Sequence, residues 1–342
     1  MIIHKLKTPV LFFVFLTCLI IPANSASGVD KQPQKSWEKI CEQVANLLLP
    51  SEDRPSPKDA KTLRECSSYH LYYGFDQPAN PEKARLCAYD EIDKARAEGP
   101  FNGEAMLMTI YANGVGARRN FDLALKLACK IGGAPAEVEG RVLHLEKLKD
   151  KNWQGNNFSL CDDITSGYMA GFCADHANRF ASGRRAKRLD KIQSKWTGAD
   201  KKEYDILRII AIRYFDIHAE NEVDRSGTAG TASSIEDTSS QEEAFTKTLE
   251  ILEHKKLPEY SHRQFRDADS KLNATYQKIQ RNSNPPWGTV TRENIKTTQR
   301  AWVKYRDAWV TFCGKKYHDC SSDGIKTYLT LKRIEELEGF LD

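Results

Sequence analysis

The sequence lacks the short motifs that carry most enzymatic and metal-binding chemistry. It contains no Cys-x-x-Cys, no His-Glu-x-x-His, no Gly-x-Ser-x-Gly and no P-loop, and its histidines are scattered. It also lacks an excess of one charge, because 51 lysines and arginines stand against 47 aspartates and glutamates, which disfavours nucleic acid as a partner. These absences predict a non-enzymatic protein without cofactor or metal, whose partner is another protein.

Long hydrophobic runs are also scarce, and the one present extends from Val10 to Ile21. Basic residues precede it and small residues follow it, the order typical of a secretory signal peptide. We therefore expect residues 1–26 to be removed on export to the periplasm. A lipid anchor at Cys18 is disfavoured, because the preceding Phe-Leu-Thr lacks the small side chain that such processing needs. No later run is long enough to span a bilayer, so we expect no integral membrane segment after signal removal.

The number of cysteines indicates how the exported chain is cross-linked. Without Cys18, eight of the nine cysteines are left, and an even number in an exported chain indicates disulfides rather than metal ligands. We paired first the cysteines that are close in sequence at helix junctions, and then the remainder by elimination. The predicted pairs are Cys313–Cys320, Cys161–Cys173, Cys41–Cys66 and Cys87–Cys129.

Residues 37–150 are predicted to form helical hairpins with short turns. Two segments repeat at an offset of 40 residues, each with a tyrosine-rich helix end, glycine and then an Asn-led helix start. The second copy resembles a Sel-like repeat, a relative of the tetratricopeptide repeat. The residues that carry this resemblance are Tyr111, Gly114, Gly116, Asp122, Ala124, Ala128 and Gly132.

Residues 156–257 form a second predicted helical region. We expect a helical hairpin closed by Cys161 and Cys173, and a long loop over residues 225–240, where nearly all residues are small or polar. The basic stretch from Arg184 to Lys202 is either an anion-binding surface or a solvated helix face.

Residues 260–342 show the clearest pattern, three amphipathic segments with short connections, which predicts a small antiparallel bundle. Three motifs in this region occur in an order that resembles the LprI-like lysozyme-inhibitor family. The motif residues are Asp269, Leu272, Asn273 and Tyr276 on the first helix, Gln299, Arg300, Trp302, Tyr305, Arg306 and Asp307 on the second, and Thr330 and Arg333 on the third. The resemblance implies an exported helical domain, associated in some family members with inhibition of lysozyme.

The motif residues allow structural and functional interpretations. Trp302, Tyr305 and Trp309 have the spacing of a packed seam, which we favour over a platform for stacking sugars. For Arg306 and Asp307 we favour an ion pair within the bundle over an interaction hot spot. Asn273 is expected to be a buried polar contact. Trp309 also stands where the family usually has a cysteine, so we expect the disulfide loop here to differ in shape from that of the family.

The segment between Cys313 and Cys320 is the predicted binding site, through Lys315, Lys316, Tyr317 and His318. A loop held at both ends loses little entropy on binding, and its lysines suit the carboxylate-lined cleft of a lysozyme. The competing interpretation is an ordinary solvated turn.

The sequence thus predicts an all-α protein with N-terminal helical-hairpin repeats followed by one or two small disulfide-closed bundles. Residues 156–257 are either a diverged second copy of the LprI-like module or an unrelated helical region. The predicted function is binding, and in its stronger form inhibition, of lysozyme-type peptidoglycan hydrolases. The alternative is a periplasmic scaffold whose repeats bind an envelope protein.

Overall fold

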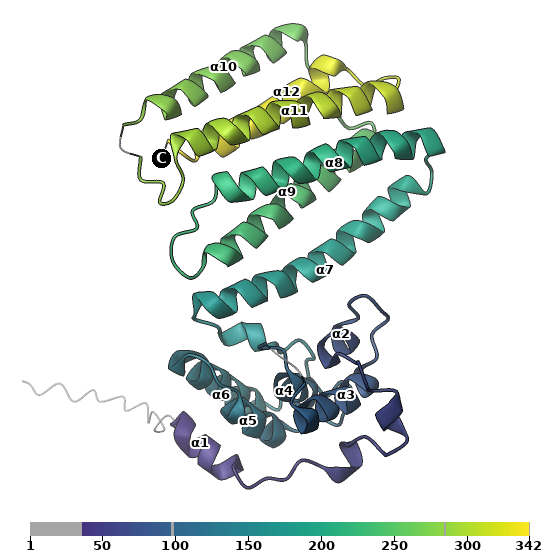
Figure 1. Ribbon diagram of the computed structural model, residues 1–342, viewed down its shortest axis with the longest axis vertical. Coiled ribbons are helices and arrows are strands. Elements are labelled where there is room, and N and C mark those ends of the chain that lie inside the picture. The colour runs from purple at the N-terminus through teal and green to yellow at the C-terminus, as the bar shows by residue number, and fades with distance from the viewer. Residues whose placement is uncertain (1–35, 97–98, 284, 342) are drawn as a thin grey trace, which may run out of the picture. The chain divides into compact units, whose positions relative to one another are not determined.

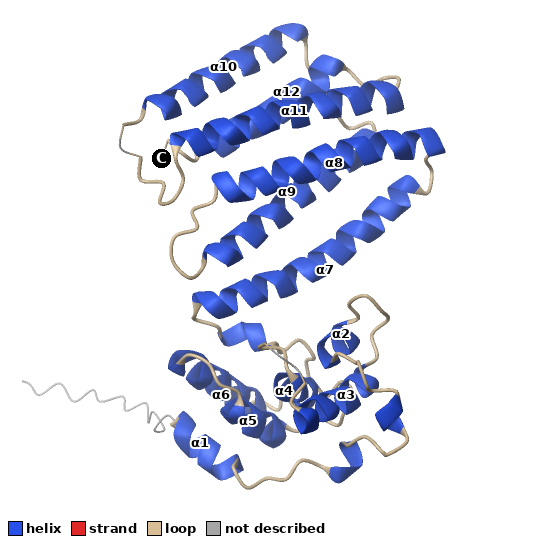
Figure 2. Ribbon diagram, viewed as in Figure 1, coloured by secondary structure: helices blue, strands red, loops and turns tan. Residues whose placement is uncertain are grey.

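The computed structural model describes residues 36–96, 99–283 and 285–341, and the predicted signal peptide lies outside these ranges. Over the described residues every regular element is a helix, twelve α-helices and three 3-10 turns, which confirms the all-α prediction (Figures 1 and 2). None of the described helices is both long and apolar enough to cross a bilayer.

The N-terminal region consists of short helices joined in pairs. Its helices are α1 (Trp37–Val44), α2 (Ser68–Tyr73), α3 (Pro81–Lys94), α4 (Gly103–Asn113), α5 (Phe121–Lys130) and α6 (Pro135–Asp150). The repeat at an offset of 40 residues is present in the backbone. Gly74 and Gly114 end α2 and α4 in the left-handed conformation that glycine adopts without strain, and Asn80 and Asn120 cap α3 and α5.

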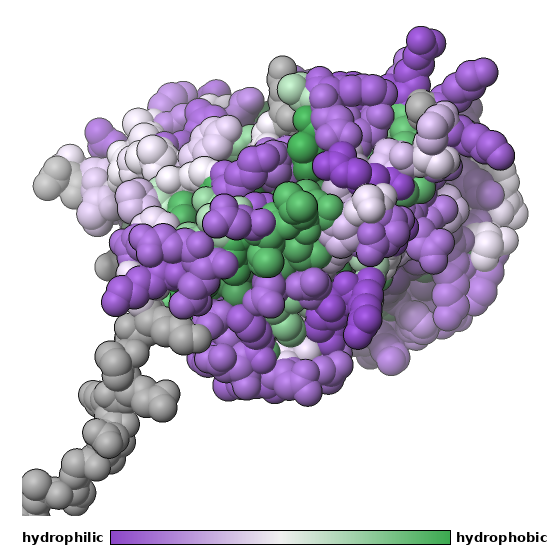
Figure 3. All heavy atoms as spheres, turned by 90° about the horizontal axis from the view of Figure 1, so that it is seen from below, coloured by the Kyte–Doolittle hydropathy of each residue, from purple (hydrophilic) through white to green (hydrophobic). Residues whose placement is uncertain are grey.

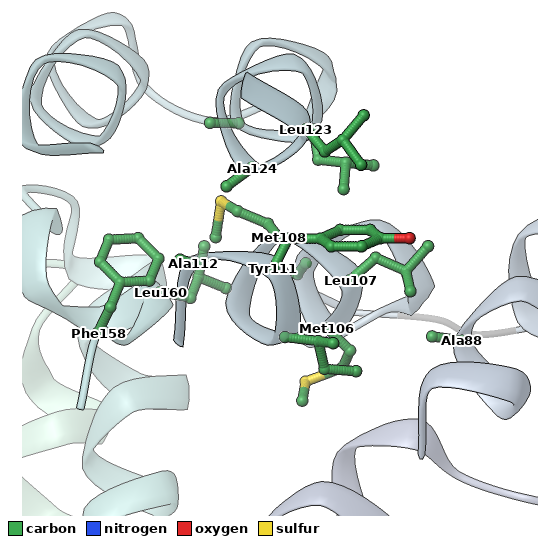
Figure 4. Close-up of a cluster of buried hydrophobic side chains, with 14 of the residues drawn as sticks. Ala88, Met106, Leu107, Met108, Tyr111, Ala112, Leu123, Ala124, Phe158 and Leu160 are labelled. Carbon is green, nitrogen blue, oxygen red and sulfur yellow. The ribbon is translucent and has the colours of Figure 1, made fainter. Parts of the chain in front are cut away.

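The core of this region surrounds α4, whose residues from Ala105 to Asn113 are all buried (Figure 4). Small side chains let the helices approach closely. A Cβ atom at Gly103 would lie 2.3 Å from the carbonyl oxygen of Ala88, so only glycine fits where α4 meets α3. Seen from below, hydrophobic residues gather in a patch that polar side chains surround (Figure 3).

Two disulfides close the N-terminal region, and their pairing corrects the prediction by elimination. Cys41 is bonded to Cys129 and Cys66 to Cys87. The repeat geometry explains the difference, because α1 packs on α5, which carries Cys129, while α2 packs on α3, which carries Cys87. The two pairs predicted from closeness in sequence, Cys161–Cys173 and Cys313–Cys320, are confirmed.

Three long helices follow, α7 (Gly167–Gln193), α8 (Gly198–Asn221) and α9 (Gly230–Glu253). Two expectations for this region are wrong. Cys161 lies in a 3-10 turn (Leu160–Asp163) rather than in a helical hairpin, and the disulfide ties this turn to the start of α7. Residues 230–240 are the first turns of α9 rather than a loop. Their small side chains allow α9 to pack closely on α7, and Ser234 and Thr238 donate to carbonyl oxygens one turn back.

The last three helices are α10 (His262–Arg281), α11 (Arg292–Lys316) and α12 (Ser322–Glu338). They are not packed only on one another. α10 packs on α12, whereas α11 makes its most extensive contact with α8 (Figure 1). Hydrophobic residues from 192 to 337 consequently form one continuous core cluster, which crosses the predicted boundary near residue 257.

Helices α7–α9 and α10–α12 repeat one packing pattern. α7 packs on α9 as α10 packs on α12, and α8 meets α9 as α11 meets α12. α8 and α11 run antiparallel, because Glu203 at the start of α8 contacts Lys315 at the end of α11, and Asn221 contacts Asn294 at the opposite ends. Halfway along, the rings of Tyr214 and Tyr305 are stacked with centroids 4.8 Å apart.

Candidate functional site

The predicted binding segment lies at the corner where α11 ends and α12 begins. α11 continues through Lys316, so Gly314, Lys315 and Lys316 are helical and only residues 317–321 form the turn. The Cys313–Cys320 disulfide joins the buried end of α11 to this turn. The corner is therefore a helix end with a short constrained turn rather than a free polar loop.

Both lysines of the corner contact carboxylates of α8. Lys315 Nζ lies 2.8 Å from Glu203 Oε2, and Lys316 Nζ lies 3.3 Å from Asp200 Oδ2. The pKa of Asp200 is lowered by the backbone hydrogen bond from Thr197 and by Lys316, which keeps the carboxylate charged. Half of the Lys315 side chain is exposed (54 %), whereas Lys316 is largely covered (17 %). Lys315 is thus the lysine that a partner can reach.

Tyr317 and His318 also differ in how exposed they are to solvent. The Tyr317 hydroxyl donates to Glu253 Oε1 at 2.8 Å, and Trp196 Nε1 donates to the same oxygen at 2.6 Å. Burial, together with this carboxylate, raises the pKa of Tyr317. His318 is exposed. The structure therefore brings the four predicted residues together at one corner but presents mainly Lys315 and His318 to solvent.

The aromatic seam is a packed core, as predicted. Trp302, Tyr305 and Trp309 are all at least 94 % buried, which excludes a sugar-stacking platform on this face. Arg306 forms an ion pair with Asp307 at 3.1 Å, a second with Asp269 at 3.6 Å, and lies over the Trp302 ring. The predicted burial of Asn273 is wrong, because this residue is exposed and hydrogen bonds to Asp269 one turn away on α10.

The region that contains these motif residues is similar to a known protein family. Residues 253–337 match the family model described as Lysozyme inhibitor LprI. No curated protein and no solved structure matches the chain. The LprI domain thus comprises α10, α11 and α12 with the Cys313–Cys320 corner, whereas α8 and α9, which share its core, lie almost wholly before the match.

A buried charge network joins the LprI domain to α8. Arg333, a motif residue on α12, is fully buried, and its guanidinium donates to Glu222 at the end of α8 at 2.5 and 2.8 Å. It also donates to Glu336 at 3.0 Å and to Gln299 at 3.0 Å. Burial opposes the charged form of Glu222, but Arg333 and His218 outweigh it and lower the pKa of Glu222 to about 2.

His218 extends this network to α9. Its Nδ1 lies 2.9 Å from Asp237 Oδ2, and its Nε2 lies 3.3 Å from Glu222 Oε2. Burial alone would lower the pKa of His218, but the two carboxylates raise it to about 10, so the imidazolium persists at neutral pH. Sequence reasoning missed this network. The four-residue spacing of His218 and Glu222 on one helix was a visible signal, but their contact with Arg333 depends on the pairing of α8 with α11 and α12.

The basic stretch from Arg184 to Lys202 is partly neutralised by acidic residues of α9. Arg185 is 5 % exposed and pairs with Glu242 at 2.7 Å, while Arg188 pairs with Glu243 and Glu250 at 2.8 and 2.7 Å. These arginines hold α7 against α9. Among the described residues, no group of three or more His, Cys, Asp or Glu side chains is placed to hold a metal ion.

Proposed function

We propose that this protein is exported to the periplasm and that it binds and inhibits lysozyme-type peptidoglycan hydrolases. The observation that carries the proposal is the match of residues 253–337 to the lysozyme-inhibitor family, in a chain with four disulfides. Disulfides persist in extracytoplasmic compartments and are rare in the reducing cytosol. The peptidoglycan layer is where such hydrolases act.

The corner of α11 and α12 is the surface we assign to this binding. Exposed ion pairs contribute little to stability, so Lys315 can exchange Glu203 for a carboxylate of a partner at small cost. Lysozyme clefts contain two catalytic carboxyl groups, which attract such a lysine. The disulfide and the contacts of Tyr317 and Lys316 fix the corner before binding, and preorganisation reduces the entropy lost on association.

The test compares variants of the full mature chain in a lysozyme inhibition assay and by surface plasmon resonance. The isolated LprI domain is unsuitable, because α8 covers its aromatic seam. We expect Lys315→Glu to weaken binding at least about tenfold, or about 1.4 kcal/mol, mainly through a slower association that salt also reduces in the wild type. Lys278→Glu is the matched control, since Lys278 is exposed at the far end of the domain. Equal affinity of both variants would remove the corner from consideration.

A second candidate function, a scaffold whose repeats bind an envelope protein, is favoured by a cavity of about 480 Å³ between the N-terminal region and the start of α7. Its lining includes Tyr168, which is exposed, and Arg141, which is buried. Arg141 donates to the carbonyl oxygens of Ala128 and Ile131, so Tyr168 is the large side chain of this lining that a partner can reach. Partners captured from envelope extract by wild type and by Lys315→Glu, but lost with Tyr168→Ala, would bind at this cavity, which the repeats and the start of α7 line together.

We also propose that residues 156–257 are a diverged copy of the LprI domain, and that residues 37–150 are Sel-like repeats. The shared packing pattern of α7–α9 and α10–α12 supports the first proposal. A shift of 91 residues relates Tyr214 to Tyr305, and it relates the pair Arg208–Glu242 to Gln299–Arg333, which occupy matching positions. Homologues in which residues near 204–218 align with the LprI motif would test this, and an unrelated sequence there would refute it.

A further inference from the structure

The outer face of α8 exposes an unusual number of aliphatic side chains. Ile206, Ile209 and Ile212 are 48 %, 68 % and 42 % exposed, whereas Leu207 and Tyr214 on the opposite side are in the core. Together these isoleucines are three of the nine large hydrophobic residues that the described part of the chain exposes, and they lie on one helix. A contiguous apolar patch on a monomer marks an interaction surface.

Charged residues on the same face lack partners. Lys202, Asp205, Arg213 and Asp216 are exposed, and their side chains form no ion pair with any other described residue. Arg208, Glu203 and Asp200, on the sides of α8 that face neighbouring helices, each have a partner of opposite charge. The charges on the outer face are thus available to a second molecule.

The sequence of this face is symmetric about Ile209. Three residues away on either side lie Ile206 and Ile212, and four residues away lie Asp205 and Arg213. Lys202 and Asp216 lie seven residues away. The positions 202, 205, 209, 212 and 216 also alternate in steps of three and four, the spacing of a seam between two helices.

This symmetry has a geometric consequence. If a second α8 lies antiparallel across the first, with a two-fold axis at Ile209, each residue faces the one equally far away on the other side. Ile206 then meets Ile212, Asp205 meets Arg213 and Lys202 meets Asp216, each pair occurring twice, while Ile209 meets its own copy once at the axis. A parallel arrangement in register would instead bring like charges together. The face is self-complementary, as a two-fold interface requires.

We infer that this protein associates with a second copy of itself through the outer face of α8, in an antiparallel helix pair centred on Ile209. One helix pair buries less area than a standard interface, so the dimer is weak, with a Kd of about 10–100 µM. The inference is independent of the proposed inhibition of lysozyme. The contact leaves the α11–α12 corner free, because Lys315 contacts Glu203 on the side of α8 that faces α11.

Sedimentation velocity of the disulfide-bonded full chain over a concentration series tests the inference. We expect the wild type to shift from monomer to dimer with rising concentration. Ile209→Glu, which places two carboxylates at the axis, should keep the chain monomeric throughout. Val303→Glu on α11 is the matched control, since Val303 is an exposed aliphatic residue (37 %) outside the face, and it should dimerise as the wild type does.

A charge exchange makes the test specific for the antiparallel register. Asp205→Arg alone should weaken the dimer at least about tenfold, because two arginines then face Arg213. Adding Arg213→Asp restores opposite charges across the interface and should return the wild-type Kd. A monomeric wild type at every concentration would overturn the inference, as would equal weakening in the single and double variants. Circular dichroism confirms that each variant is folded.

Discussion

The two hydrophobic cores of this chain are built on different principles. The N-terminal core, from Ile40 to Leu160, consists largely of alanine, leucine, methionine and tyrosine on helices that are neighbours in sequence. The C-terminal core, from Ile192 to Leu337, is rich in aromatic side chains and joins helices that are far apart in sequence. The first is closed by two disulfides, whereas the second contains the buried network of Arg333, Glu222 and His218.

The difference shows two ways of fixing which helices pair. In the N-terminal core, tight glycine turns and covalent bonds leave few alternatives. In the C-terminal core, five amphipathic helices of similar length have many possible partners, and apolar contacts alone do not discriminate among them. A buried ion pair tolerates only the arrangement that satisfies it, so we expect the network to specify the register of α8 against α12.

The largest difference in stability between the two regions is expected when their disulfides are removed. The Cys41–Cys129 bond spans 88 residues and the Cys313–Cys320 bond only 7. The entropy lost by the unfolded chain grows with loop length, so Cys41→Ala with Cys129→Ala should lower the free energy of unfolding by about 4–5 kcal/mol. Cys313→Ala with Cys320→Ala should lower it by about 2 kcal/mol. Urea denaturation measures both, and equal losses would contradict the entropic explanation.

The next prediction concerns the network itself. Arg333→Met should lower the free energy of unfolding by about 3–5 kcal/mol, because the buried Glu222 loses both hydrogen bonds from the guanidinium and keeps only His218 as a charged partner. Combining it with Glu222→Gln removes this poorly compensated charge, so the double variant should be more stable than Arg333→Met alone. Thermal and urea unfolding monitored by tryptophan fluorescence give the comparison. A double variant that is less stable than the single one would mean that the network acts mainly through packing.

The sequence predicted most of the helices and the aromatic seam because both depend on local spacing. The alternation of Trp302, Tyr305 and Trp309 indicates a buried helix face whatever covers it. It does not indicate that α8 packs against this face, since several amphipathic helices offer a similar hydrophobic face. The two wrong disulfides have the same origin, because elimination ignores which helices are neighbours.

At the candidate site, too, contacts between residues far apart in sequence could not be predicted. Position in the chain placed Lys315, Lys316, Tyr317 and His318 together, and the structure does bring them to one corner. Their partners Glu203, Asp200 and Glu253 lie 64 to 116 residues away in sequence, so the neutralised charges were not visible. The start of α9 was missed because small polar residues favour turns in isolation, whereas packing on α7 stabilises a helix there.

Two histidines should make the stability of the two regions depend on pH in opposite directions. Burial among aromatic rings lowers the pKa of His176 to about 4, below the unfolded value near 6.5. Its contribution is therefore present above pH 6.5 and lost as the pH falls toward 4. The pKa of His218 is raised to about 10, so its contribution is present below pH 6.5 and lost as the pH rises toward 10.

We expect each histidine to account for about 1–3 kcal/mol over its own range. Unfolding free energies measured across pH 4–10 should therefore fall on both sides of neutrality. His176→Gln should flatten the acidic side alone, and His218→Gln the alkaline side alone. A single variant that flattens both sides would show that the two regions do not titrate separately.

The smallest effect is expected at an ion pair on the surface. Lys255 and Asp319 lie 2.9 Å apart, but both side chains are 81 % exposed. Solvent and salt screen such pairs, so Lys255→Met should leave the melting temperature unchanged within error. Scanning calorimetry of this variant beside Arg333→Met contrasts a surface pair with a buried one. A clear loss for Lys255→Met would indicate that the turn after α11 is more important than its exposure suggests.

The pairing of α8 with α11 has a consequence for how the chain matures. Synthesis delivers the polypeptide from its N-terminus, and domains fold as they become complete. The N-terminal core can close once residue 160 has emerged, and its disulfides can form then. The part of the aromatic face of α8 that α11 covers stays open until residues 292–316 follow. During that interval Tyr214, which stacks on Tyr305 in the folded chain, is open to water, and we expect this stage to be the one most prone to aggregation.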